Sequence, residues 1–300
     1  MVKGNLPFVR SLRLTHPDKL LWPESGITKL EYVKYLYAVH EPLLRYTRGR
    51  TVTLIRYPNG IYGHSFYQKN CPRYAPAWVP RHPSNGAGAI LLNDLPTLLW
   101  LGNQAALEFH VPFHEAKDHR PRELALDLDP SAPGFAQVTE VALLLRDTAC
   151  RLGLPAYVKT SGATGLQVYI PLQPRYTYGD TRRVGAFLAR YLAERYPRLV
   201  TVARRVGERG TRVYVDYLQH GPGRTLPAPY SPRGRPGAPV STPLSWEELE
   251  RGVDPAELNI RTVPERLRSL GDPFAPVTSG QGRASLDEIL AFLAKRLPER

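Results

Sequence analysis

Cysteine and methionine are scarce in this chain of 300 residues, which has two Cys and one Met. Cys71 and Cys150 lie far apart and form no C-x-x-C pair. This excludes a disulfide framework and a cysteine-based zinc site, and it predicts reduced thiols in a cytosol. No apolar run reaches the roughly 18 residues of a membrane span, and Met1 to Arg13 include no apolar segment typical of a secretory signal. We therefore expect a cytoplasmic protein with no membrane partner.

Acidic residues are too few to balance the basic ones. The chain has 27 Asp and Glu against 40 Lys and Arg, which gives a formal net charge of +13. Only 8 of the basic residues are lysine, and arginine is the side chain that can bind a phosphate through two hydrogen bonds. The surplus favours a polyanionic partner, nucleic acid before a membrane surface. A soluble, arginine-rich protein of a thermophile is the alternative interpretation.

Internal repeats and clear linkers are also absent, which excludes solenoids and propellers and favours one domain. Apolar residues make up 42% of the chain, enough to build a core. Strands are expected both after helices and in hairpins, so we predict an α+β fold. We expect a single domain over residues 1–300, with an N-terminal lobe of about 1–100, a core of about 101–250 and a helical tail of about 251–300.

Apolar periodicity and turn residues predict the individual elements. Helices are expected over residues 28–44, 97–107, 133–152 and 181–196, and two more begin at Ser245 and Ser285. Strands are expected over residues 51–57, 62–68, 108–111, 123–128, 157–160, 166–172 and 212–218.

The main chemical signal is a pair of carboxylates, Asp127 and Asp129, at the end of an apolar strand. Side chains alternate along a strand, so both point to the same side and repel each other unless a cation or proton lies between them. Asp216 lies in a second apolar strand, where an ionised carboxylate needs a cation or strong donors. Oxygen ligands of this kind suit Mg²⁺ or Mn²⁺, and three of them could form a two-metal site for phosphoryl transfer. A loop cap or a salt bridge is the alternative for the pair.

A glycine-containing loop over residues 160–165 joins two apolar strands. Its glycines allow close backbone approach, and its hydroxyls and amides can bind phosphate. It is not a P-loop, because no Lys-Ser/Thr follows the second glycine. Lys159 and the basic segment 224–235 could add positive charge to the same phosphate site. A plain hairpin turn and a solvated loop are the alternatives.

From about Leu12 to Leu249 the chain resembles the polymerase domain of bacterial DNA ligase D, within the archaeo-eukaryotic primase superfamily. No single block is specific, but the order and spacing of the blocks together are. The blocks are LTHPDK at residues 14–19, GITK at 26–29, RYPNG at 56–60, FYQK at 66–69, AALEFHVP at 105–112, DLDP at 127–130, TSGATGL at 160–166, VDYLQ at 215–219 and APYSPRGRPG at 228–237.

The resemblance implies a primase-type catalytic core with mixed or antiparallel sheets flanked by helices, plus a small N-terminal lobe. It implies template-directed nucleotide addition at DNA ends and short gaps in non-homologous end joining, with ribonucleotides and Mn²⁺ favoured over deoxyribonucleotides and Mg²⁺. The implied partners are gapped, nicked or overhanging DNA with a 5′-phosphate, nucleoside triphosphates, Ku and a separate DNA ligase. The implied location is the bacterial or archaeal cytoplasm, at the nucleoid.

The resemblance also assigns roles by position. Asp127, Asp129 and Asp216 become the catalytic ligands of two metal ions, one held by all three residues and the other by the first two. The residues assigned to the incoming nucleotide are His110, beside its sugar, and Ser161, Gly162, Thr164, Gln167, Gln219 and Arg233. Lys19 and Lys29 are assigned to the 5′-phosphate of the DNA, and Arg56, Phe66 and Tyr67 to the template. Arg209 is assigned to a mobile loop over residues 204–212.

Several of these residues have simpler explanations. Lys19 and Lys29 could be solvated lysines, and His110 could be a packed, hydrogen-bonded strand histidine. Phe66 and Tyr67 are adjacent on a strand and face opposite sides, so at least one could belong to the core. Zinc bound by His110, His114 and His119 is not expected, because Pro112 interrupts helical pairing and no fourth ligand is evident.

Two features depart from the family pattern. Gln167 stands where the family has a histidine that contacts phosphate; its amide can donate a hydrogen bond but brings no charge. Loss of a charge-assisted bond costs about 1–2 kcal/mol unless a nearby arginine compensates. The chain also has no K-x-D-G motif of a ligase, which predicts a stand-alone polymerase or an excised domain.

Three other functions compete with the polymerase hypothesis. A catalytically weak module that bridges DNA ends would follow from Gln167. A metal-dependent nuclease could use the same carboxylates, although it needs no triphosphate site such as the glycine loop and Arg233 predict. A primase shares the catalytic core and differs in starting chains without a primer.

Overall fold

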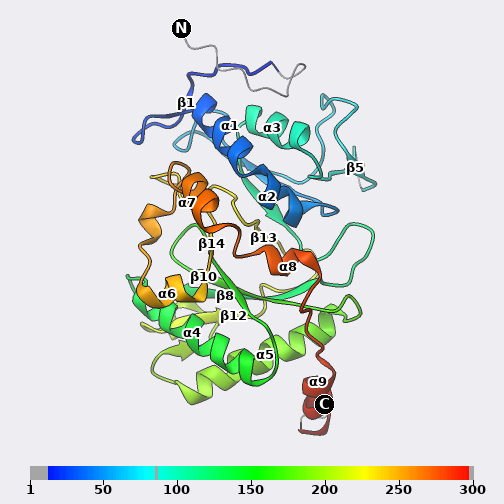
Figure 1. Cartoon of the computed structure of the whole chain (residues 1–300), viewed down its shortest axis with the longest axis vertical. Helices are drawn as coiled ribbons and strands as arrows, with labels where there is room; N and C mark the ends of the chain where they lie inside the picture. Colours follow the sequence, from blue (N-terminus) through cyan, green and yellow to red (C-terminus); the bar gives the residue numbers. More distant parts are fainter. Residues whose placement is uncertain (1–12, 85–86, 297–300) are drawn as a thin grey trace.

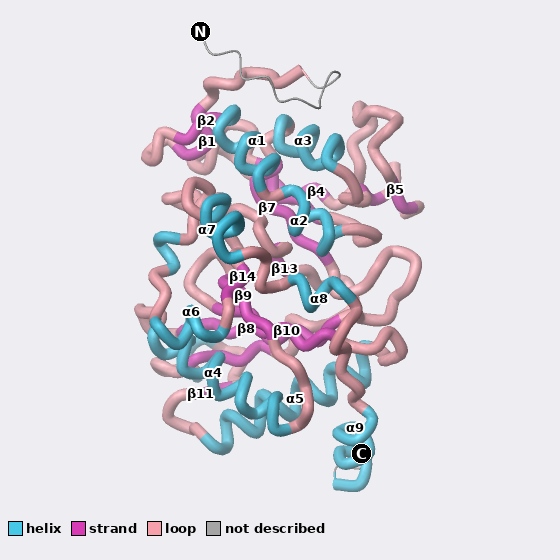
Figure 2. The backbone as a smooth tube through the Cα atoms, viewed as in Figure 1, coloured by secondary structure: helices cyan, strands magenta, loops and turns pink. Residues whose placement is uncertain are grey.

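The computed structural model describes residues 13–84 and 87–296. Two sheets, built mostly of antiparallel strands, form its centre. Helices cover them from above and below in the view of Figure 1. Strands and helices alternate irregularly along the chain, as Figure 2 shows. The α+β prediction is therefore confirmed. In the described ranges, no helix has the length and apolar character needed to cross a membrane.

The larger sheet has six strands in the order β11-β12-β8-β10-β9-β14, antiparallel except for the β11–β12 pair. Its strands are β8 (Glu123–Pro130), β9 (Tyr157–Thr160), β10 (Leu166–Pro171), β11 (Val200–Thr201), β12 (Val213–Asp216) and β14 (Pro243–Leu244). The helices α4 (Ala136–Arg151) and α5 (Tyr178–Arg195) pack on this sheet. Both lie below it in Figure 1.

The smaller sheet has four antiparallel strands in the order β13-β7-β3-β4. They are β3 (Thr53–Arg56), β4 (Phe66–Gln68), β7 (Ala106–Val111) and β13 (Leu226–Pro227). The helix α3 (Leu95–Asn103) packs on β7 and on α1 (Lys29–Ala38), and α2 (His40–Thr47) follows α1. This sheet takes strands from both sides of the lobe boundary expected near residue 100, so the two lobes share one continuous core.

The remaining elements are short and lie at the edges. Two small hairpins are formed by β1 (Leu20–Trp22) with β2 (Ile27–Thr28) and by β5 (Arg81–His82) with β6 (Ala89–Ile90). The helices are η1 (Val206–Glu208), α6 (Trp246–Arg251), η2 (Pro255–Glu257), α7 (Val263–Leu270), α8 (Ala275–Ser279) and α9 (Asp287–Arg296). The segment between β13 and β14 joins the two sheets, and it carries Arg233.

Two predicted helices have different bounds in the structure. The helix expected over residues 28–44 is broken at Val39, because Pro42 in the first turn of α2 has no N–H to donate to the preceding turn. Thr28 does cap α1, accepting a hydrogen bond from the Glu31 backbone at 3.2 Å. The helix expected up to Leu107 ends at Asn103, since Ala105 takes a positive φ of 54° and the chain enters β7.

Candidate functional site

A cavity of about 790 Å³ opens between the two sheets. It is lined from the smaller sheet by Thr53 and His110 and from the larger one by Asp127, Asp129 and Gln167. The other predicted residues in its wall are Tyr67, Ser161, Thr164, Gln219 and Arg233. The structure thus brings together residues more than a hundred positions apart in the sequence.

The two carboxylates reach this cavity through the alternation of β8. Leu126 and Leu128 are fully buried on one face of the strand, which leaves Asp127 and Asp129 on the other. The neighbouring strand β12 is antiparallel and places Asp216 directly opposite Asp127. The Oδ1 atom of Asp216 accepts hydrogen bonds from the backbone N–H of Leu218 at 2.9 Å and of Gln219 at 3.0 Å. Asp216 is therefore next to the pair, with one of its two oxygens bonded to its own loop.

The carboxylates are poorly compensated. Burial, together with the charge of Asp129, raises the pKa of Asp127 to about 7. Burial and the charge of Asp216 also raise the pKa of Asp129, although Arg209 opposes them. Among the described residues, neither Asp127 nor Asp129 forms an ion pair. A positive charge from outside the chain would relieve this repulsion.

These groups fit a hard divalent cation by their chemistry, since both offer carboxylate oxygen at the edge of a wide cavity. Within residues 13–84 and 87–296, no three side chains of His, Cys, Asp or Glu stand close enough to hold one ion. Asp127 and Asp129 are the residues that would hold it. Asp216 could join through its Oδ2 atom, because the backbone of Leu218 and Gln219 bonds to Oδ1.

Gln167 is held at both ends of its amide. Its Nε2 donates to Asp127 Oδ1 at 3.1 Å, and its Oε1 accepts from Lys159 Nζ at 2.5 Å. Lys159 is fully buried and also donates to Ser241 Oγ at 2.5 Å. Lys159 therefore does not line the cavity, contrary to the expectation that it adds charge to a phosphate site. The charged residue that bonds to the Gln167 amide is therefore a lysine, and not the nearby arginine that could compensate for the missing histidine.

The glycine loop is ordered by its own backbone and by Arg233. Ser161 Oγ accepts from the N–H of Ala163 and of Gly165, at 3.2 and 3.1 Å. Arg233 Nη1 donates to Ser161 O at 2.6 Å. Gly162 has φ of +71°, and a Cβ there would lie 2.6 Å from Arg233 Cγ. Gly162 thus serves close packing against the Arg233 segment, while Ser161 and Thr164 face the cavity.

Sequence reasoning missed Glu108, which is 3% exposed. Its Oε2 accepts from Arg233 Nε at 2.8 Å and contacts His110 Nε2 at 2.9 Å. Its Oε1 accepts from Tyr57 OH at 3.1 Å and from Gly234 N at 3.0 Å. The signal in the sequence was the E-x-H spacing, which places Glu108 and His110 on one face of β7.

The residues predicted to contact DNA lie toward the N-terminal end. Lys19 is half-buried and its Nζ donates to Asn59 Oδ1 at 2.9 Å. Lys29 is 5% exposed, and its Nζ donates to Thr15 O at 2.8 Å and Asn103 O at 3.1 Å. Burial and the charge of Lys19 lower the pKa of Lys29. Lys29 thus bonds to two backbone carbonyls in a buried position, whereas Lys19 is half-buried and bonds to one side chain.

The predicted template residues divide between two faces of β4, as alternation requires. Tyr67 is 70% exposed and lines the cavity. Phe66 lies under the guanidinium of Arg56, whose Cζ is 5.3 Å from the ring centroid. Arg56 also donates to Gln68 Oε1 at 2.9 Å and Tyr74 OH at 2.7 Å. Arg56 and Phe66 therefore form one packed unit.

Gln219 and Arg209 are both held by backbone carbonyls. Gln219 Nε2 donates to Thr225 O at 3.0 Å, which fixes the loop that closes one end of the cavity. Arg209 stacks on Tyr214 with its Cζ 3.8 Å from the ring centroid, and its Nε donates to Ala203 O at 3.1 Å. Arg209 is thus anchored beside Asp129 in this structure.

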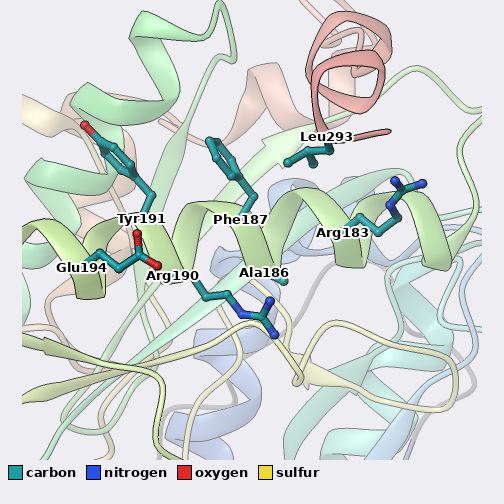
Figure 3. A pocket seen from close by; sticks show the side chains of 7 residues that line it. All are labelled: Arg183, Ala186, Phe187, Arg190, Tyr191, Glu194 and Leu293. Carbon is teal, nitrogen blue, oxygen red and sulfur yellow. The ribbon is translucent and has the colours of Figure 1, made fainter. Parts of the chain in front are cut away.

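A second cavity, of about 460 Å³, lies between α5 and α9. Figure 3 shows the side chains of Phe187 and Leu293 facing it from the two helices. Its other lining residues are Arg183, Ala186, Arg190, Tyr191 and Glu194. It contains none of the predicted site residues, most of which line the cavity between the sheets.

Comparisons with known proteins identify the family of the chain. Residues 28–274 match the family described as LigD, primase-polymerase domain. The chain is 38% identical over 298 residues to the bifunctional non-homologous end joining protein LigD of Bacillus subtilis, covering 99% of this chain and 49% of that protein. It is 33% identical over 276 residues to the multifunctional non-homologous end joining protein LigD of Mycolicibacterium smegmatis, covering 89% and 36%. The chain thus spans about half or less of these relatives.

A solved structure is similar across almost the whole fold. It is the polymerase domain from Mycobacterium tuberculosis ligase D in complex with DNA, with a TM-score of 0.82 and 32% identity. The similarity covers 90% of this chain and 98% of that chain.

Proposed function

This chain belongs to the LigD primase-polymerase domain family, and on that premise we propose that it adds nucleotides to DNA ends and short gaps under the direction of a template. The observation that carries the proposal is one cavity that collects two carboxylates and groups able to bind phosphate. Asp127 and Asp129 line it together with Arg233 and the Ser161 loop. This arrangement suits a triphosphate and a divalent cation better than it suits a nuclease, which needs no triphosphate site.

Asp127 and Asp129 would hold Mn²⁺ or Mg²⁺. Where two ions bind, Asp216 would be the further ligand. Ions held there neutralise the triphosphate and lower the pKa of a primer 3′-hydroxyl. Arg233 would contact phosphate oxygens, and Thr164 and Gln219 would complete the phosphate side of the cavity. Ser161 holds the loop closed through the N–H of Ala163 and Gly165. The chain supplies no nucleophile, so positioning and charge neutralisation account for the rate.

The DNA would lie over the smaller sheet and the N-terminal hairpin. Exposed Tyr67 offers a ring for base stacking at the cavity. Lys19 is the favoured ligand of a downstream 5′-phosphate, with Lys29 supporting the hairpin from behind. The net charge of +13 supports salt-sensitive binding to DNA. We also propose ribonucleotide preference, association with the nucleoid, and cooperation with Ku and with a separate ligase.

The test uses a gapped duplex with a recessed 3′-hydroxyl and a downstream 5′-phosphate. Extension is measured with Mn²⁺ or Mg²⁺, with each ribonucleotide and deoxyribonucleotide, for wild type and Asp127→Ala. We expect templated extension by wild type alone. Tight, salt-sensitive binding without extension under either metal would contradict the polymerase proposal and favour a module that bridges ends. Products on unprimed single strands would identify a primase.

A further inference from the structure

Glu108 lies behind the cavity wall, where it is hydrogen-bonded to the lining residues His110 and Arg233. Four groups from three segments hydrogen-bond to its two oxygens: Tyr57, His110, Arg233 and Gly234. The fit is close, because a Cβ on Gly234 would lie 2.2 Å from Tyr57 Cζ. Although burial alone acts to raise it, the hydrogen bond of His110 and the charge of Arg233 lower the pKa of Glu108 to about 2. Glu108 is therefore an ionised acceptor.

An ionised carboxylate accepts hydrogen bonds and donates none. The contact of 2.9 Å between Glu108 Oε2 and His110 Nε2 thus requires the proton of the ring to be on Nε2. Burial lowers the pKa of His110 despite the opposing effect of Glu108, which keeps the ring neutral. A neutral ring with Nε2–H has a bare lone pair on Nδ1. The carboxylate thereby selects the tautomer.

His110 lines the cavity, and Nδ1 is its polar atom that is left for a ligand. In residues 13–84 and 87–296, Nδ1 has no hydrogen-bond partner. A bare acceptor repels phosphate oxygens and pairs with a hydroxyl or an N–H. A template-directed site must take all four bases, whose amino groups differ, whereas the sugar hydroxyls are common to all of them. A sugar hydroxyl is therefore the donor that we expect at Nδ1, in line with the place beside the sugar that the resemblance implies for His110.

We propose that Glu108 is a positioning residue that fixes His110 as the Nε2–H tautomer, so that Nδ1 accepts a hydrogen bond from a sugar hydroxyl of the bound nucleotide. The ligand assignment rests on the proposed function. The same carboxylate aligns Arg233, which reaches Ser161 O at 2.6 Å. Glu108 thus couples the sugar side of the cavity to its phosphate side.

The direct test is the tautomer of His110 in the ligand-free protein, read from long-range ¹H–¹⁵N correlation spectra. The His110 signals are assigned by their loss in His110→Gln. We expect a neutral Nε2–H ring in wild type. We expect a changed tautomer population in Glu108→Gln, because the single amide oxygen of Gln cannot accept hydrogen bonds from His110, Arg233 and Gly234 together. A neutral Nδ1–H ring or an imidazolium in wild type would overturn the proposal, whether or not the variant folds.

The second measurement is binding of ATP and of dATP with Mn²⁺, without DNA. Glu108→Gln should reduce the preference for ATP by about fivefold, the equivalent of one neutral hydrogen bond. The control is Glu123→Gln, because Glu123 is fully buried and pairs with Arg50 at 2.5 Å away from the cavity lining. This control should lose stability but keep the His110 tautomer and the preference.

The outcomes separate the two proposals. An unchanged ATP preference in Glu108→Gln with an altered tautomer overturns the hydroxyl pairing. An equal loss of the ATP preference in Glu123→Gln overturns the specific role of Glu108, because general destabilisation would then explain the effect. If wild type binds neither nucleotide, the proposed function fails and the hydroxyl pairing fails with it. The tautomer spectra still decide whether Glu108 positions His110.

Discussion

Asp127 and Asp129 line the cavity, and Glu108 lies behind its lining residue His110. The protein balances the charges of these two acidic sites in opposite ways. Glu108 receives hydrogen bonds from four groups, one of them an arginine, within the fold. Asp127 receives one from the neutral amide of Gln167. The pKa of Asp127 is accordingly raised to about 7, and that of Glu108 is lowered to about 2. The comparison teaches that the fold completes one carboxylate site itself and leaves the other for a ligand of positive charge.

The largest expected effect comes from removing the incomplete site. Asp127→Asn should reduce templated extension by about a thousandfold or more, because several kcal/mol of metal-supplied transition-state stabilisation are lost. The free energy of unfolding of the metal-free protein should stay equal or rise, since repulsion with Asp129 is removed. Gap extension and urea unfolding measure the two quantities. A variant that extends at a rate within tenfold of wild type would show that Asp127 holds no catalytic cation.

Glu108→Gln should have the opposite effect to Asp127→Asn, because its main consequence is a loss of stability. The change leaves Arg233 without its charged partner in a buried setting, which costs about 3 kcal/mol. We expect this decrease in the free energy of unfolding by urea denaturation, with Glu123→Gln as the matched buried carboxylate. Unchanged stability would mean that the four hydrogen bonds to Glu108 are replaceable by water.

The pH dependence of stability should have opposite signs at the two sites. An unfolded Asp has a pKa of about 3.9, and the pKa of Asp127 in the fold is about 7. The metal-free native state therefore binds the extra proton, and its stability falls as pH rises through this window. Glu108 contributes stability that is lost only as pH falls from about 4.3 toward 2. Thermal unfolding across pH should show the first slope in wild type and a shallower one in Asp127→Asn; equal slopes would contradict the charge assignment.

The smallest effect is expected at the position that departs from the family. Gln167 accepts from Lys159 and donates to Asp127, and the two nitrogens of a neutral histidine can make the same two bonds. Gln167→His should therefore change the extension rate by less than about fivefold, the value of one hydrogen bond. A gain of tenfold or more would show instead that the site lacks a positive charge.

The sequence predicts best what depends on local pattern. The alternation of β8 places Asp127 and Asp129 on one face, and the strand pattern and resemblance give the α+β fold. It predicts poorly what depends on partners far along the chain. Glu108 reads as an ordinary strand residue until Arg233, 125 positions later, is brought to it. The sequence predicts that Lys159 adds charge to a phosphate site and that Lys29 holds a 5′-phosphate, but the fold buries both. The break at Val39 follows from one proline in the next turn.

The most direct test of the account is a calorimetric titration of Mn²⁺ into the DNA-free protein, slightly below neutral pH, in two buffers of different ionisation enthalpy. The account predicts that wild type binds Mn²⁺ and releases protons, because Asp127 is partly protonated before the ion displaces the proton. Asp127→Asn should lose most of this binding, and Glu108→Gln, if folded, should retain it. Equal Mn²⁺ binding by wild type and Asp127→Asn would contradict the central claim that the fold leaves these aspartates for a cation.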